Sequence, residues 1–196
     1  MKKAIKIISK ISFLVFLLFS FELKSKISIG DENSKVTVKV FSSLTCPACA
    51  NFHSKIYYQL KKEFIDGGLV KFEHHPFPLD LAALNAEIIL RCDVDNSKVF
   101  KLLSKIYEKQ RVWAVGSDIN MINDSIKKIA LQLNLDNKKM NDCLQNDKKQ
   151  DEILNQRIEA QKKYKIESTP TILINEKKYS GKIEYFEFKK AIEKNL

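Results

Sequence analysis

The stretch LTCPACANFH, residues 44–53, contains Cys46 and Cys49 with two residues between them, and His53 follows four residues after the second cysteine. A pair with this spacing can exchange electrons as a dithiol and disulfide, bind a metal with further ligands, or close a short loop. The flanking segments help to decide among these roles, because they show which element carries the cysteines.

The cysteine motif lies at a predicted strand-to-helix junction. Residues 35–43, KVTVKVFSS, alternate valines with polar residues and are rich in β-branched side chains, which predicts a strand. Pro47 stands where a first helical turn would begin, because proline is well tolerated at that position. Apolar residues then recur every four positions until the glycines at 67 and 68: Phe52, Ile56, Leu60 and Phe64.

A second strand, a helical block and a hairpin follow the junction. Residues 69–78, LVKFEHHPFP, predict a strand that ends at its prolines and completes a βαβ unit. Residues 79–165 show several helical periodicities and no strand pattern. Residues 167–181, ESTPTILINEKKYSG, predict a hairpin, and residues 186–196 predict a closing helix. The order βαβ, helical insertion, ββα predicts an α/β protein that folds as one body.

The first 26 residues differ in composition from the rest of the chain. A lysine-rich start precedes the apolar run ISFLVFLLFSF and a polar segment, which is the layout of an export signal peptide. The run is shorter than the ~20 residues that a membrane-spanning helix needs. An uncleaved N-terminal anchor remains the alternative, because no clear Ala-x-Ala site follows.

Net charge argues against a nucleic-acid partner. The chain carries +10 at pH 7, and residues 1–26 supply six lysines and one glutamate, which is half of that excess. The remaining lysines are mixed with acidic residues along the chain. We therefore expect a solvated surface without a basic nucleic-acid groove.

The four cysteines, Cys46, Cys49, Cys92 and Cys143, allow three pairings, and sequence alone cannot choose among them. The first two are close enough to pair with each other, which leaves Cys92 with Cys143. A helix N-terminus lowers the pKa of a thiol, because unpaired N–H groups carry partial positive charge. We therefore expect Cys46 to be the nucleophile and the more buried Cys49 to be the resolving thiol.

The motif Cys46-Pro47-Ala48-Cys49, the order of elements and the late Thr169-Pro170 resemble the DsbA-like branch of the thioredoxin superfamily, and SSLTCPAC is similar to its alphaproteobacterial members. The resemblance covers about residues 33–196. It implies a thioredoxin fold with residues 79–165 as an inserted helical domain. It also implies a monomeric, periplasmic protein-disulfide oxidoreductase without a cofactor, which would act on exported proteins with free cysteines and be reoxidised by a DsbB-like, quinone-linked membrane partner.

The resemblance assigns roles to further residues. In the family the late proline is cis and exposes the backbone of the preceding residue to substrate, which would be Pro170 and Thr169 here; a trans proline that starts a strand is the alternative. The family pattern of a second cysteine pair favours a structural disulfide between Cys92 and Cys143. Two buried, unpaired thiols are the alternative there.

Two departures from the family pattern stand out. Many members carry a buried acidic residue in the strand before the motif, where this chain has Val40, so proton handling by a buried acid is in doubt. The strongest oxidants place histidine between the cysteines, whereas this chain has Pro47-Ala48. We therefore expect a milder oxidant.

Other functions remain open from the sequence. A reductase or isomerase would use the same cysteine pair in its reduced state. A copper- or zinc-binding protein could use Cys46, Cys49 and His53, although no fourth ligand is evident; otherwise His53 would be a half-exposed helix residue. Attachment of c-type haem is excluded, because Ala50 and not histidine follows the second cysteine.

Overall fold

The computed structural model describes residues 27–92 and 96–196, so the expected leader at residues 1–26 lies outside the described residues. In this described part of the chain, five strands form one sheet in the order β1-β3-β2-β4-β5. Only β2 and β3 run parallel, and the other neighbours are antiparallel. The strands are β1 (Ile27–Ile29), β2 (Val36–Ser42), β3 (Val70–Pro76), β4 (Thr171–Ile174) and β5 (Lys177–Lys178).

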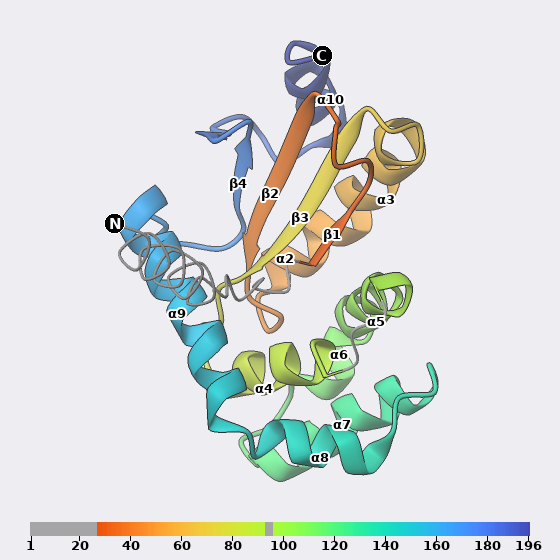
Figure 1. Ribbon diagram of the computed structural model, residues 1–196, viewed down its shortest axis with the longest axis vertical. Coiled ribbons are helices and arrows are strands. Elements are labelled where there is room, and N and C mark those ends of the chain that lie inside the picture. The colour runs from red at the N-terminus through yellow and green to blue at the C-terminus, as the bar shows by residue number, and fades with distance from the viewer. Residues whose placement is uncertain (1–26, 93–95) are drawn as a thin grey trace, which may run out of the picture.

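The helical crossover from β2 to β3 begins at the cysteine motif and contains two π-helical stretches. Its parts follow one another without a break: α2 (Pro47–Phe52), η1 (His53–Tyr57), α3 (Tyr58–Leu60) and η2 (Lys61–Ile65). Together with α10 (Tyr185–Glu193) it covers one face of the sheet (Figure 1). The valines of β2 lie buried against this layer, as the strand alternation predicts.

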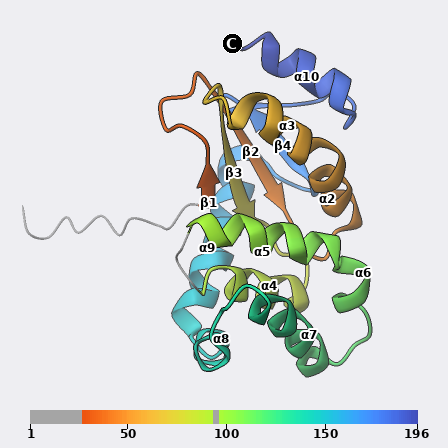
Figure 2. The same cartoon turned by 90° about the vertical axis from the view of Figure 1, so that its right-hand side faces the viewer.

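Between β3 and β4 the described residues form six helices. They are α4 (Leu81–Leu90), α5 (Asn96–Glu108), α6 (Gln110–Trp113), α7 (Ile119–Leu131), α8 (Asn137–Leu144) and α9 (Asp147–Tyr164). Helices α4 to α8 make a layer at one end of the sheet (Figure 2). Side chains of Asp80, Asp118, Asp136 and Asn146 cap the N-termini of α4, α7, α8 and α9. This is the inserted helical domain that the sequence predicts.

A disulfide links two parts of the helical block, and the long helix α9 connects the block to the sheet. Cys92, which follows α4, and Cys143 of α8 are bonded with an S–S distance of 2.01 Å. Helix α9 runs back to the sheet and covers its second face, where Ala160 packs with Phe41, Phe77 and Leu173. Phe77 is thus a core residue, whereas Leu79 is half exposed.

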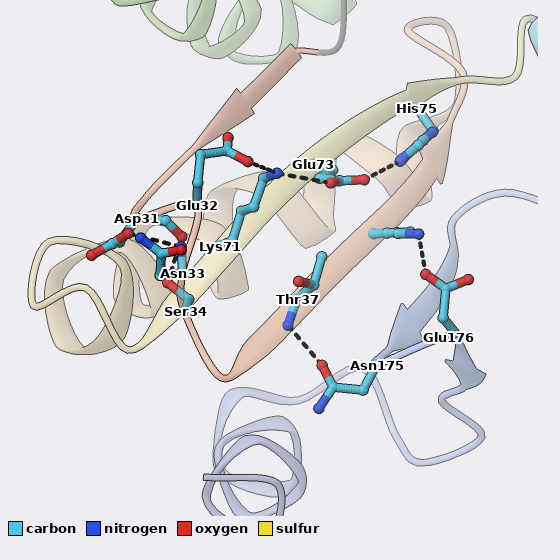
Figure 3. Close-up of polar contacts among 11 residues, drawn as sticks. Asp31, Glu32, Asn33, Ser34, Thr37, Lys71, Glu73, His75, Asn175 and Glu176 are labelled. Carbon is cyan, nitrogen blue, oxygen red and sulfur yellow. Dashed lines mark hydrogen bonds and ion pairs between the residues drawn. The ribbon is translucent and has the colours of Figure 1, made fainter.

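The second face of the sheet also carries a chain of polar contacts (Figure 3). Lys71 lies between the carboxylates of Glu32 and Glu73, and His75 Nε2 is 2.9 Å from Glu73 Oε2. At the β4–β5 turn, the backbone N–H of Thr37 donates to Asn175 Oδ1 at 2.8 Å. The contacts of Glu32 and Asn175 join the β1–β2 and β4–β5 connections to neighbouring strands of the sheet.

Strand β1 is the main element that the sequence did not predict. It has only three residues, and it pairs with the outer edge of β3. A strand of that length shows too little alternation to be recognised. Within residues 27–92 and 96–196, no helix is both long enough and apolar enough to cross a membrane.

Candidate active site

Cys46 lies in the short connection between the end of β2 and the start of α2. It is the N-cap residue, with φ −76° and ψ 119°, and Pro47 occupies the first turn. Its thiol is partly exposed, and Sγ donates to the carbonyl oxygen of Thr169 at 3.4 Å. The nucleophile expected from the sequence is therefore accessible at the protein surface.

The surroundings of Cys46 favour its thiolate and lower its pKa to about 5. The largest cause is a hydrogen bond from the Cys49 thiol, and burial opposes it. The side chain of Thr169 and the backbone N–H groups of Cys49 and Ala48 add to the lowering. The backbone donors belong to the first turn of α2, where the partial positive charge of a helix N-terminus favours a thiolate, so the fold itself lowers the pKa of this cysteine.

Cys49 has the opposite character. It is only 2% exposed, and burial followed by the neighbouring Cys46 raises its pKa far above that of a free thiol. The two cysteines therefore divide into an accessible thiolate and a buried thiol. That division matches what thiol–disulfide exchange requires of an attacking and a resolving cysteine.

The segment before β4 lies against this pair. The peptide bond between Thr169 and Pro170 is cis, and both residues are partly exposed. The Thr169 carbonyl faces Cys46, as the contact between them shows. The sequence-predicted residues Cys46, Cys49, Thr169 and Pro170 thus meet at one place, while Cys92 and Cys143 lie apart from it in the helical block.

Gln110 of α6 holds the active-site loop from the helical side. Its amide nitrogen donates to the carbonyl oxygen of Leu44 at 2.8 Å and to that of Cys46 at 3.0 Å. Gln110 is 6% exposed, so these bonds are shielded from water. Sequence reasoning missed this residue, because a single glutamine in a helical segment carries no motif.

The expectation of a half-exposed His53 is wrong. The ring is 3% exposed, stacks on Tyr57 with centroids 4.3 Å apart, and places Nε2 2.9 Å from Ser104 Oγ on α5. Burial first, and then the charge of His74, lower its pKa to about 3. Among the residues the structure describes, no three histidine, cysteine or acidic side chains are grouped to hold a metal. His53 instead joins the crossover helix to the helical block.

Comparison with known proteins agrees with this geometry. The thioredoxin family model matches residues 22–194. Disulfide bond formation protein D of Bacillus subtilis is 32% identical over 184 residues, which are 89% of this chain and 78% of that protein. A putative protein-disulfide oxidoreductase of Rickettsia bellii is 27% identical over 75% of this chain, which spans 56% of that relative.

Comparison with solved structures also finds DsbA-like proteins. The crystal structure of Wolbachia pipientis alpha-DsbA1 superposes with a TM-score of 0.79 at 25% identity, covering 91% of this chain and 93% of that one. BdbD from Bacillus subtilis, in its oxidised form, has a TM-score of 0.71 at 23% identity over 89% of this chain and 94% of its own, which shows the shared fold. This chain is a DsbA-like oxidoreductase of the thioredoxin family.

The DsbA-like oxidoreductase has a buried carboxylate on α4 of the helical insertion, whereas the strand position considered for it holds Val40. Glu87 of α4 is 0% exposed, and its Oε1 lies 2.7 Å from Nε2 of His74 on β3. His74 is the register partner of Val40 across the β2–β3 pair. A buried carboxylate is thus present, but it comes from the inserted helix and not from the strand before the motif. Its signal in the sequence was a lone glutamate in the apolar run LAALNAEIIL.

A groove opens beside the cysteine motif of this DsbA-like oxidoreductase. Its volume is about 450 Å³, and it lies between the crossover helix and helices α5 and α6. Pro47 and Ala50 line one wall, and Tyr107 and Arg111 line the other. Trp113 of α6 is 1% exposed and donates its indole N–H to the Ile106 carbonyl at 2.8 Å, so it is a core residue.

Proposed function

We propose that this DsbA-like oxidoreductase is exported and introduces disulfide bonds into periplasmic proteins. A substrate thiolate attacks Cys46 of the oxidised pair, and the Cys46–Cys49 bond breaks to leave a mixed disulfide. The second substrate thiol then displaces Cys46, so the substrate leaves oxidised and the enzyme leaves reduced. The two electrons stay on the cysteines, which makes a cofactor unnecessary.

The lowered pKa of Cys46 is the observation that carries the oxidising direction. A pKa of about 5 means that the reduced enzyme holds a stable thiolate at neutral pH. An enzyme whose reduced form is stabilised passes its disulfide to others, as holds for DsbA. Because Pro47 and Ala48 add no charged donor between the cysteines, we expect an oxidant milder than the strongest of the family.

Other residues receive supporting roles in this proposal. The backbone of Thr169, followed by the cis Pro170, receives the substrate peptide beside Cys46, since it already contacts that thiol. The Cys92–Cys143 bond is a structural disulfide that does not take part in exchange, because both cysteines are buried away from the pair. A DsbB-like, quinone-linked membrane partner would reoxidise the enzyme, which we expect to act as a monomer. The leader at residues 1–26 would export it or anchor it.

Equilibration of the full-length protein with glutathione buffers tests the direction. An oxidase would show a potential of about −120 to −180 mV for the Cys46–Cys49 pair, whereas a reductase would lie near about −270 mV, the thioredoxin value. Cys46→Ser should abolish exchange, and a Cys92→Ala and Cys143→Ala double variant should retain it as the matched control. A value near that of thioredoxin would overturn the oxidase in favour of the reductase.

A further inference from the structure

The groove beside the cysteine motif is continuous with the site of thiol exchange. Its volume of about 450 Å³ falls within the roughly 300–1,000 Å³ of pockets that bind small ligands. One wall begins at Pro47, the residue after Cys46. The other wall includes Gln110, whose amide nitrogen lies 3.0 Å from the Cys46 carbonyl oxygen. A substrate that is bonded to Cys46 therefore has this groove beside it.

The lining of the groove offers both apolar and polar surface. Pro47, Ala50 and Tyr58 supply apolar atoms, and the Tyr58 side chain is 47% exposed. Asn51 and Ser54 supply polar groups from the same crossover helix. A side chain with methylenes and a charged end suits such a lining, because its methylenes pack on apolar atoms while its end stays among polar ones.

Arg111 of α6 brings a positive charge to the groove that no carboxylate matches. Its side chain is exposed, and none of the residues that the structure describes forms an ion pair or a side-chain hydrogen bond with it. Glu108 also lines the groove, but its Oε2 lies 2.8 Å from Lys105 Nζ. The charge of Glu108 is thus matched within α5, whereas the guanidinium of Arg111 is open to a partner.

The other cationic groups near the groove do not replace Arg111. His53 lines the groove, but burial lowers its pKa to about 3, so the ring is neutral at pH 7. Lys109 lies two residues before Arg111, and its Nζ is 3.4 Å from Gln132 Oε1. An anion that enters the groove therefore meets the charge of Arg111.

We propose that the groove is a specificity subsite in which Arg111 binds an acidic side chain of the substrate protein. The proposal rests on the exchange reaction proposed above and adds which substrate cysteines react fastest. A guanidinium suits a carboxylate, because its planar fork donates two parallel N–H bonds. An aspartate or glutamate within about three positions of the substrate cysteine can reach the groove, since each residue spans about 3.3–3.6 Å of extended chain.

Oxidation of three short peptides by the oxidised full-length protein tests the subsite. Each peptide contains two cysteines, and the residues on either side of the first cysteine are both glutamate, both glutamine or both lysine. In the reaction the two peptide thiols become a disulfide, and the Cys46–Cys49 bond becomes two thiols. Acid quenching and mass measurement give the second-order rate constant for each peptide.

The informative quantity is the rate ratio of the glutamate peptide to the glutamine peptide, compared between enzyme variants. A charged neighbour changes the pKa of the peptide thiol itself, and this comparison cancels that effect because the peptides stay the same. Arg111→Gln should lower the ratio about two- to fivefold, as an exposed ion pair contributes that much. Arg111→Glu should lower it about five- to tenfold, because repulsion replaces attraction. The same variant should raise the ratio of the lysine peptide to the glutamine peptide.

Lys109→Glu is the matched control. It changes the net charge as Arg111→Glu does, at a residue of the same surface that does not line the groove. We expect it to lower the glutamate ratio much less than Arg111→Glu. Ionic strength gives a second control, since the Debye length falls to about 3 Å at about 1 M salt. The difference between wild type and Arg111→Glu should therefore shrink at high salt.

The outcomes separate the subsite from the proposed function. If the wild-type protein oxidises none of the three peptides, the proposed function fails and the subsite fails with it. If it oxidises them but the glutamate ratio is the same in wild type and in both Arg111 variants, the subsite alone is overturned. An equal loss in Lys109→Glu and Arg111→Glu would also overturn it, because the effect would then belong to the net charge of the surface.

Discussion

The reduced protein should lose free energy of unfolding as the pH falls toward the pKa of Cys46. The folded pKa of about 5 lies below the ordinary value of 9.0, so the folded state holds the thiolate where the unfolded chain still holds the thiol. For a depressed acid, the added stability is complete above the unfolded pKa and is lost as the pH falls through the folded one. The window therefore runs from about pH 9 down to about pH 5.

The size of the effect follows from the same two values. Between pH 7 and a pKa of about 5 lie two units, which correspond to about 2.7 kcal/mol. Cys46 is partly exposed, and solvent screening reduces such a contribution, so we expect on the order of 1–2 kcal/mol at pH 7. At about pH 4 the contribution should be absent.

Urea unfolding of the reduced protein at both pH values measures this difference. Cys46→Ser is the control, because its hydroxyl does not ionise in this range. The free energy of unfolding of the wild type should exceed that of the variant more at pH 7 than at pH 4. Ultraviolet thiolate absorbance should titrate with a midpoint near pH 5. A midpoint between pH 8 and 9, or a stability difference that does not change with pH, would refute the account of Cys46 activation.

Three further predictions concern groups around the site. Replacing Cys92 and Cys143 together by alanine should lower the free energy of unfolding by about 4 kcal/mol, because their bond closes a separation of 51 residues, and urea unfolding measures the loss. Gln110→Ala should cost about 1–3 kcal/mol, because two shielded carbonyls lose their donor; an unchanged urea midpoint would contradict that contact. Glu87→Gln should destabilise the protein by about 3–5 kcal/mol in thermal or urea unfolding, because it leaves the buried Arg91 without its counter-charge. Wild-type stability in that variant would mean that Arg91 finds another partner.

Local patterns predicted the elements that carry the site. Valine alternation located β2, and Pro47 with the four-residue apolar period located the helix that begins at Cys46. These features depend on neighbours in the chain, so the exposed and buried characters of Cys46 and Cys49 followed from them. The lone Thr169-Pro170 dipeptide was placed beside the cysteines through family resemblance, because residues 123 positions apart share no local pattern.

Contacts between the crossover helix and the inserted block were beyond sequence reasoning. His53 lies four residues after Cys49 on the same helical face, so it was in a position to be buried. Its burial depends on α5 covering that face, with Ser104 supplying a partner. The contacts of Gln110 with the motif and of Glu87 with His74 on β3 likewise arise only when the helical block folds onto the sheet.

The two bonds of Gln110 have a consequence for exchanging parts between related proteins. The loop that presents Cys46 is shaped by a side chain 64 residues away, so a transplanted Cys-Pro-Ala-Cys loop would arrive without one of its supports. A chimaera that kept the loop but took its helical insert from another parent would leave the Leu44 and Cys46 carbonyls unbonded unless that insert also supplied an amide there. The motif and the insert therefore depend on each other structurally, and a chimaera should take both from the same parent protein.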